Sequence, residues 1–139
     1  MRAFNTTIYN AGPAASISTD LTLEQDAARA NLGGNWRMPT KAECQELIDN
    51  CDVTWTNDYN ETGVAGRVFT SKVNGKSVFF PAAGSCNDSS ANDVGSFGHY
   101  WSASWDSPSH AWKLWFDSRM KGLDYSLRYY GYSVRGVCE

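Results

Sequence analysis

The residues most able to do chemistry are concentrated in the last third of the chain. The stretch AWKLWFDSRMKGLDYSLRYYGYSVRG, residues 111–136, holds two tryptophans, one phenylalanine and four tyrosines among charged side chains. No nucleophile–base motif accompanies them, because neither His99 nor His110 lies in a serine or cysteine signature. The nearby aspartates are spaced irregularly, which does not favour a catalytic carboxylate pair. The sequence therefore predicts binding and no catalytic residue.

The segment AWKLWF has the alternation of a β-strand. Successive side chains of a strand point to opposite faces, so Trp112, Leu114 and Phe116 are expected on the buried face. The residues between them, including Trp115, then point the other way. The tryptophan on this second face is flanked by a lysine and an aspartate, which are rarely buried in a core, so we expect this face to be exposed to solvent.

The segment that follows, residues 119–130, has neither a strand nor a helix period, and we expect a surface loop there. Exposed tyrosines and tryptophans with mixed charges are typical of binding surfaces, since they offer large, rigid contact areas. A second core layer or an oligomer contact would account for the same rings, and that alternative stays open. The expected ligand-binding residues form one solvent-facing patch: Trp105, Asp106, His110, Lys113, Trp115, Asp117, Arg119, Tyr125, Tyr129 and Tyr130.

The sequence predicts neither a metal ion nor a cofactor. Its four cysteines, at positions 44, 51, 86 and 138, form no CxxC pair, and two histidines are too few for a typical zinc site. The loop NDSSANDVG is rich in oxygen ligands but is more simply a solvated loop than a calcium site. We expect the cysteines to be free, with a Cys86–Cys138 disulfide left open.

Length and charge exclude several classes of protein. A chain of 139 residues is most simply one domain, here residues 1–139. Its net charge of −3 and lack of a basic block do not favour nucleic-acid binding. It has no run of about 18 apolar residues, so we expect no membrane insertion, and its first residues lack the apolar core of a secretion signal.

The pattern along the chain predicts an α+β fold. A helix is expected from the Thr22 N-cap to Gly33, and another begins at Thr40 with Glu43 completing a capping box. Residues 67–84 predict a hairpin around Asn74-Gly75. Residues 84–99 are small and polar and predict a long surface loop, after which strand signals resume. Two helices should therefore pack on one side of a small, mostly antiparallel sheet.

The asparagines are distributed unevenly. All ten lie in residues 1–92, and none occurs in residues 93–139. Random placement would produce this with a probability of roughly 2%. Composition alone offers no reason for it.

Several ordered motifs resemble a known family. The stretches NLGGNWRMPTKAECQELIDNC, KVNGKSVFFPAAG, GHYWSAS, AWKLWFDS and RYYGYSVRGV are similar to the "major paralogous domain" family of Bacteroidota surface proteins. The resemblance covers about residues 20–138. It implies a C-type-lectin-type fold related to formylglycine-generating enzymes.

One branch of that family comprises the variable proteins of diversity-generating retroelements, in which asparagine codons of a C-terminal segment are rewritten. The resemblance implies a diversified face over about residues 103–132 and gives the missing asparagines a cause. Calcium-dependent sugar motifs and the catalytic cysteine pair of the related enzymes are absent. The scaffold positions that the resemblance implies are Trp101, Ser102, Ala111, Leu114, Phe116, Ser118, Arg128, Gly131, Ser133, Val134 and Arg135.

The resemblance implies a non-enzymatic ligand- or receptor-binding domain, in a phage receptor-binding protein or a bacterial surface adhesin. Its partner would be a protein or glycan receptor on a cell surface, and it would act at a cell surface or on a virion within a larger assembly. The main alternative is an ordinary surface lectin or adhesin module without diversification. A degenerate sulfatase-activating enzyme would need copper or a reactive cysteine pair, and the sequence indicates neither.

Overall fold

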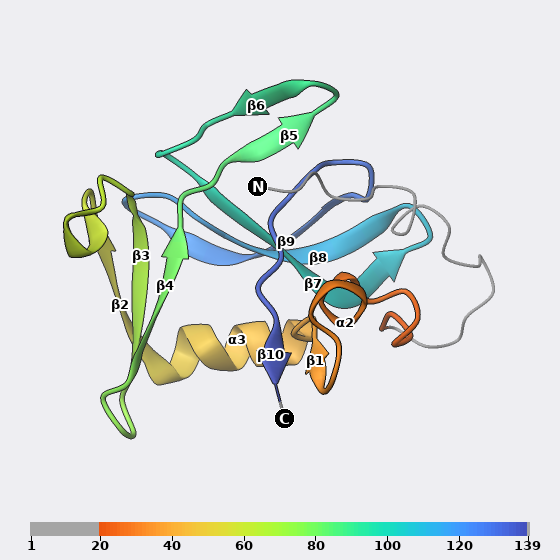
Figure 1. Cartoon of the computed structure of the whole chain (residues 1–139), viewed down its shortest axis with the longest axis horizontal. Helices are drawn as coiled ribbons and strands as arrows, with labels where there is room; N and C mark the ends of the chain where they lie inside the picture. Colours follow the sequence, from red (N-terminus) through yellow and green to blue (C-terminus); the bar gives the residue numbers. More distant parts are fainter. Residues whose placement is uncertain (1–19, 139) are drawn as a thin grey trace.

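The computed structural model describes residues 20–138, which form a mixed α+β fold of mostly antiparallel strands (Figure 1). The expected class is confirmed. The single expected sheet is not, because the described strands form four small sheets: β1-β10, β2-β3-β4, β5-β6 and β7-β8-β9. The expectation about a secretion signal concerns residues outside the described range. The elements are α2 (Ala27–Leu32), β1 (Trp36–Arg37), α3 (Lys41–Asn50), β2 (Cys51–Thr56), the 3-10 helix η1 (Tyr59–Glu61), β3 (Gly66–Ser71), β4 (Ser77–Pro81), β5 (Ser85–Asn87), β6 (Ser90–Asn92), β7 (Gly98–Ser107), β8 (His110–Phe116), β9 (Lys121–Leu127) and β10 (Val137–Cys138).

The longer helix, α3, begins as predicted. The Thr40 side chain accepts a hydrogen bond from the Glu43 backbone N–H, and the Glu43 carboxylate accepts one from the Thr40 N–H. Arg37 donates two 2.7 Å bonds to the same carboxylate. This Arg37 pairing lowers the pKa of Glu43 to about 2. The capping box therefore also ties α3 to β1.

The shorter helix, α2, begins later than predicted. Its N-cap is Asp26, whose Oδ1 accepts the backbone N–H of Ala28 and Arg29, whereas Thr22 belongs to a preceding turn. The other carboxylate oxygen accepts the Met38 N–H at 2.8 Å. Asp26 is buried and satisfies three donors, so it outcompetes a solvent-exposed cap at Thr22. The helix ends at Gly33 as expected, in a positive φ of 68°.

The predicted hairpin is confirmed as β3–β4, and β2 pairs with β3 on its other side. Arg67 on β3 is buried, and its Nε donates to the Asp117 carbonyl at 3.0 Å. Burial lowers the pKa of this guanidinium. Arg67 thereby joins the β2-β3-β4 sheet to the turn after β8.

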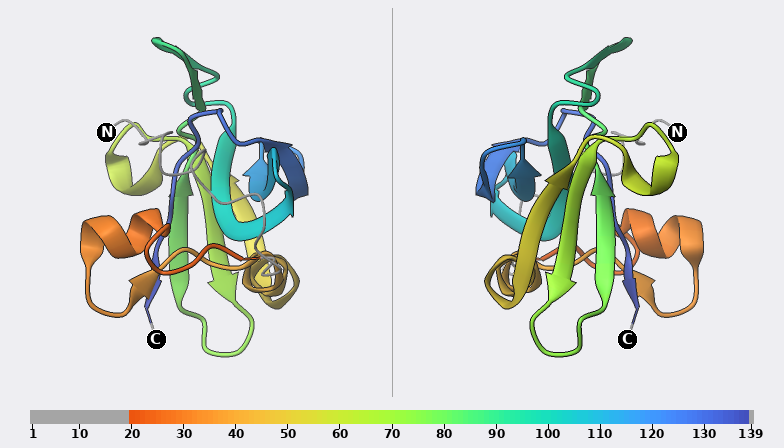
Figure 2. Two further views of the ribbon diagram at one scale, coloured as in Figure 1. Left: turned by 90° about the vertical axis from the view of Figure 1, so that its right-hand side faces the viewer. Right: turned by 90° about the vertical axis from the view of Figure 1, so that its left-hand side faces the viewer.

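Two segments expected to be loops contain strands. Residues 84–99 include the short β5–β6 hairpin, which projects from the body of the molecule (Figure 2). Residues 119–130 include β9, paired with β8 along its whole length. Buried and exposed residues do not alternate along β9, because it is an edge strand with one face only partly covered. Its sequence therefore lacks the alternation of apolar and polar residues that predicts a strand.

The face of the β7-β8-β9 sheet that packs against α3 is named here the α3 face. Leu114 and Phe116 of β8 lie on it, buried with Cys44 of α3 and Phe69 of β3 in one core cluster. Burial raises the pKa of the Cys44 thiol to about 12, so this cysteine acts as a small apolar side chain. The alternation predicted for β8 therefore places Leu114 and Phe116 correctly.

The C-terminal segment closes the fold at the other edge of this sheet. The Trp101 N–H donates to the Ser133 carbonyl and the Ser133 N–H donates to the His99 carbonyl, each at 3.0 Å. Ser133 thus runs parallel to β7 before the chain continues into β10, which pairs with β1. Segments from the start and the end of the described chain are thereby held together.

Two glycines of the β7-β8-β9 sheet should respond oppositely to substitution. A Cβ at Gly98 would overlap the ring of Phe116, which is fully buried and cannot move aside. Gly98→Ala should therefore lower the free energy of unfolding by about 1–3 kcal/mol. A Cβ at Gly122 would meet nothing closer than the Trp115 Nε1 at 3.4 Å, so Gly122→Ala should be neutral or slightly stabilising. Urea unfolding of both variants checks this, and equal losses would contradict the packing described.

Candidate functional site

The second face of the β7-β8-β9 sheet, named here the Tyr132 face, is covered by Tyr132 of the C-terminal segment and by α2, whose Ala28 shares a core cluster with Tyr132. The two helices therefore lie on opposite faces of this sheet, whereas the sequence predicted them on one side. The Tyr132 ring lies 4.5 Å from that of Trp101 and 4.8 Å from that of His99, both on β7. Its hydroxyl donates to the Ser126 Oγ of β9 at 3.3 Å. Tyr132 therefore spans all three strands, and burial raises its pKa.

Beneath this ring lies Lys113, which was predicted to be exposed and is 7% exposed. Its Nζ is 4.8 Å from the Tyr132 ring centroid and donates to the Tyr132 hydroxyl at 3.5 Å. Burial lowers the pKa of Lys113, while Asp124, its neighbour on β9, opposes the shift. The alternation of β8 was correct, but it could not reveal that a segment 19 residues further on covers this face.

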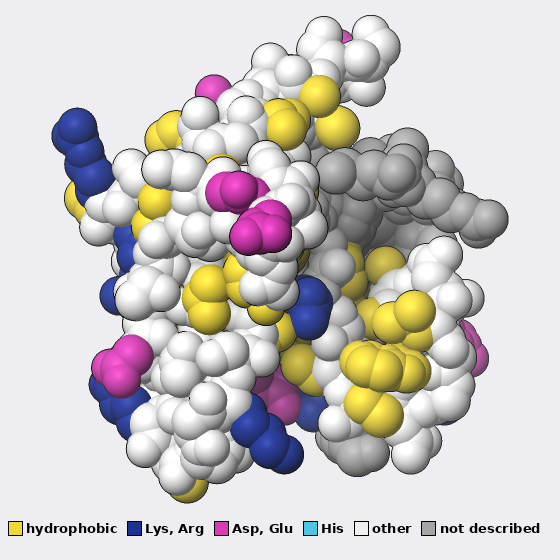
Figure 3. Space-filling model, turned by 60° about the vertical axis from the view of Figure 1, so that its left-hand side comes forward, with side chains coloured by type: hydrophobic (Ala, Val, Ile, Leu, Met, Phe, Trp, Pro, Cys, Tyr) yellow, Lys and Arg dark blue, Asp and Glu magenta, His cyan; other side chains and the backbone are white. Residues whose placement is uncertain are grey.

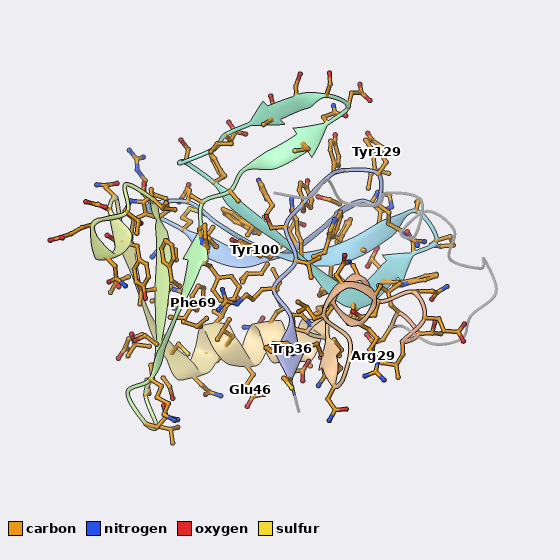
Figure 4. All side chains as sticks on the ribbon, in the orientation of Figure 1. Arg29, Trp36, Glu46, Phe69, Tyr100 and Tyr129 are labelled. Atoms are coloured by element: carbon orange, nitrogen blue, oxygen red, sulfur yellow. The ribbon has the colours of Figure 1, made fainter. Side chains whose placement is uncertain are left out.

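A row of stacked aromatic rings runs along the Tyr132 face. Phe97 stacks on His99, which stacks on Tyr132, and Tyr132 stacks on Tyr130 at 5.7 Å. Tyr129 adds the last ring, 4.6 Å from Tyr130, and is 49% exposed. It lies on the side of the sheet away from α3 (Figure 4). The row thus begins beside β7 and ends in solvent.

Two predicted ligand-binding residues lie on the opposite side. Tyr125 pairs with Trp112 across β8 and β9, their rings are 5.5 Å apart, and His110 packs edge-on against Tyr125. Trp112 is itself capped by Lys41, the first residue of α3, at 3.2 Å. Tyr125, 49% exposed, and His110 therefore belong to the α3 face and do not join Tyr129 in one patch.

Trp105 and Asp106 lie near the end of β7. The Arg128 guanidinium lies 4.3 Å from the Trp105 ring and donates to the Pro108 carbonyl at 2.8 Å. Trp105 is half-buried, and its Nε1 has no hydrogen-bond partner among the described residues, whereas Asp106 is exposed. These contacts fix the entry to the segment that carries Tyr129 and Tyr130.

The remaining predicted residues lie toward the other end of the sheet. Trp115 is half-buried on the Tyr132 face, opposite His99 of β7. Asp117 and Arg119 lie in the turn between β8 and β9, where Asp117 Oδ1 accepts the N–H groups of Arg119 and Met120 at 2.6 Å each. These backbone donors lower the pKa of Asp117. Of the ten predicted residues only Lys113 is buried, but they occupy four regions: the Tyr132 face, the α3 face, the end of β7 and the β8–β9 turn.

This turn forms one wall of a cleft that the sequence did not predict. The cleft has a volume of about 400 Å³ and gathers residues from three segments far apart in the chain. No local sequence signal could have found it, because each segment contributes only two or three residues. Its lining residues are Trp55, Asn57, Gly95, Ser96, Phe97, Asp117, Ser118 and Arg119.

Another side of the molecule is more apolar. Figure 3 shows hydrophobic side chains gathered over α2 and β1, where Leu32 is 58% and Trp36 40% exposed. A mostly apolar cavity of about 110 Å³ lies between α3 and the core, with Arg135 and Glu43 among its lining residues. Neither feature includes any of the predicted ligand-binding residues.

The described residues bring together no group of three or more metal-ligating side chains, and the residues of the NDSSANDVG loop belong to β5, β6 and their flanking turns. Cys86 and Cys138 are both exposed and form no disulfide with each other. Between residues 20 and 138, no helix is long and apolar enough to cross a membrane.

The scaffold positions implied by the resemblance divide into two groups. Most are buried or half-buried, and two, Ser118 and Arg135, are exposed. Arg135 nevertheless has a structural contact, since it donates to the Phe79 carbonyl at 3.2 Å. The fully buried members are Trp101, Ser102, Ala111, Leu114, Phe116 and Arg128.

Together these features define a small α+β domain with an aromatic surface row and a polar cleft. The chain belongs to the family described as a domain of unknown function (DUF8237), whose model matches residues 48–137. That stretch runs from the last turn of α3 into β10 and contains both the Tyr132 face and the cleft. Comparisons with curated proteins and with solved structures found no match.

The stacked row should make stability depend on pH through His99. Burial, assisted by Lys113, lowers the pKa of His99 from 6.5 to about 4. The unfolded chain takes up a proton as the pH falls below 6.5 while folded His99 stays neutral, so stability should fall between pH 6.5 and 4. The variant His99→Phe keeps the stacked ring but cannot take up a proton. Its free energy of unfolding should therefore fall less between pH 6.5 and 4 than that of the unmodified protein. Urea unfolding at several pH values checks this, and parallel curves for both proteins would contradict it.

Replacing a core ring and a surface ring by alanine should change the free energy of unfolding by very different amounts. Trp101 is 1% exposed, and its Nε1 donates to the Tyr130 carbonyl at 3.2 Å. Trp101→Ala should therefore cost about 3–5 kcal/mol of the free energy of unfolding. Tyr129→Ala removes only an exposed ring and should stay within about 0.5 kcal/mol. Chemical denaturation measures both, and a similar cost would make Tyr129 a core residue.

Proposed function

We propose that this protein is a non-enzymatic ligand-binding domain that contacts a cell-surface receptor through the Tyr132 face. The observation that carries the proposal is the row of stacked rings that ends in solvent at Tyr129. Tyr130 and Trp115 extend the contact area, and the exposed carboxylate of Asp124 supplies charge beside it. Exposed aromatic anchors with a polar surround are typical of binding hot spots.

The rigidity of this surface supports the proposal. Each ring of the row rests on the next, and the backbone carbonyl of Tyr130 is held by Trp101. Side chains that are already ordered lose little conformational entropy when a ligand binds. A receptor would therefore meet a surface largely formed before contact.

We further propose a C-type-lectin-type fold, with a relationship to the "major paralogous domain" family. The features that favour it are the α+β class, the pairing of β1 with β10 and the burial of Trp101, Phe116 and other implied scaffold positions. In this proposal residues of the 103–132 interval vary between copies of the protein, and the domain acts at a cell surface or on a virion.

The absence of asparagine from residues 93–139 favours diversification by a retroelement over an ordinary surface lectin or adhesin module. The two functions differ in one observable respect. A near-identical template repeat beside a reverse-transcriptase gene should accompany the diversified protein and not the ordinary module. Sequencing the neighbouring DNA therefore decides between them, while leaving the binding role of the Tyr132 face to a separate test.

That test uses two tyrosines with equal exposure. Tyr129 and Tyr125 are each 49% exposed, but Tyr125 lies on the α3 face. The purified domain is screened on glycan and cell-surface protein arrays, and the ligands found are titrated against both alanine variants. Tyr129→Ala should weaken binding at least about tenfold, as expected for an aromatic anchor, and Tyr125→Ala by less than about threefold. Ligands that depend on Tyr125 alone, or the absence of any ligand, would contradict the proposal.

A further inference from the structure

We propose that the cleft between β2 and the β8–β9 turn is a saccharide-binding site, distinct from the Tyr129 end of the Tyr132 face, although Phe97 belongs to both the cleft and the stacked row. Its volume of about 400 Å³ lies within the roughly 300–1,000 Å³ of small-ligand pockets. Trp55 and Phe97 contribute aromatic walls, and the other side chains are polar. The size of the cleft suits a mono- or disaccharide.

The charges of the cleft favour a neutral, hydroxyl-rich ligand. Asp117, whose pKa is lowered by the turn N–H groups, and Arg119 supply one negative and one positive charge. A phosphate or another anion would meet the Asp117 carboxylate, and a lipid would meet mainly polar groups. A sugar needs both donors and acceptors for its hydroxyls and an aromatic face for its C–H groups, and the cleft offers all three.

Several polar atoms of the cleft have no partner among the described residues. Asp117 uses Oδ1 for the turn, which leaves Oδ2 as an acceptor. Asn57 uses its Oδ1 to accept the Trp55 Nε1–H at 2.8 Å, which leaves its amide N–H groups as donors. The Arg119 guanidinium and the Ser96 and Ser118 hydroxyls complete the set.

These groups are held in position before any ligand arrives. Trp55 packs against the core cluster on one side and is fixed by Asn57 on the other. Asp117 is fixed by its two 2.6 Å bonds, and its carbonyl accepts the Arg67 Nε. A site whose hydrogen-bonding groups are already oriented loses less entropy when it binds.

The test is a titration of the domain with lactose, cellobiose, chitobiose and mannobiose, followed by ¹H–¹⁵N NMR. At least one sugar should shift the Trp55 indole and Asn57 amide signals, with saturation transfer from the protein to the sugar. Asp117→Asn keeps an oxygen for the turn but replaces the second acceptor by an amide, and Arg119→Ala removes an exposed donor. Each should weaken that sugar about tenfold or more. Arg119→Ala should leave the urea midpoint unchanged, whereas Asp117→Asn should lower it slightly, because the charged carboxylate holds the N–H groups of the turn.

Two variants serve as controls. Lys76→Ala removes an exposed cation from the β3–β4 turn, away from the cleft, and should leave sugar binding unchanged. Tyr129→Ala should also leave it unchanged, so failure of the cleft and failure of the Tyr132 face are distinguishable. No shift with any of the sugars, equal affinity in Asp117→Asn and Arg119→Ala, or binding of inorganic phosphate in place of sugar would overturn the proposal.

Discussion

The position of Tyr132 across the β7-β8-β9 sheet is the constraint on which the rest of the structure depends. α3 covers one face of the sheet. On the other face the Tyr132 ring shields residues of three strands, and Ala28 of α2 packs beside it in the same core cluster. That ring can reach them only because Ser133 is hydrogen-bonded along the edge of β7. The same bonds direct the chain toward β10 and its pairing with β1.

Burying Tyr132 in this way also buries polar groups, and each needs compensation. Lys113 is removed from water, which is unfavourable for its charge. This is offset by contact with the electron-rich face of the Tyr132 ring, by a hydrogen bond to the Tyr132 hydroxyl and by attraction to the Asp124 carboxylate. The buried Nδ1 of His99 has no hydrogen-bond partner among the described residues. Burial lowers the pKa of His99 to about 4, so its imidazole is neutral near pH 7. The interior of this face is therefore more polar than the α3 face, where apolar contacts dominate.

The sequence predicted the structure correctly where interactions between residues close together in the chain decide the local conformation. The Thr40–Glu43 capping box, the Asn74-Gly75 hairpin and the burial of Leu114 and Phe116 all follow from short-range geometry. The prediction failed where a distant group decided the outcome. Asp26 replaced Thr22 as a cap because it also binds Met38, 12 residues away.

The candidate site illustrates the same limit. Alternation correctly separated the two faces of β8, and the exposed tyrosines were found, but exposure of Lys113 was wrong because Tyr132 covers it. The separation of the ten residues into different regions depends on which segments pack on each face and on where the strands end, and the alternation of the sequence carries no information about either. Cleft residues such as Trp55 were missed because they meet the β8–β9 turn only through tertiary structure.

The way in which the segment after β9 is fixed bears on what its side chains are free to do. Arg128 anchors it through the Pro108 carbonyl, and its own N–H donates to the Ser109 carbonyl. Trp101 binds the backbone carbonyl of Tyr130, not its ring. Because these bonds use backbone atoms, replacing the side chains of Tyr129 or Tyr130 leaves them in place. A surface built on such a backbone can change its chemistry while the fold beneath it stays the same, which is the physical requirement for a face that varies.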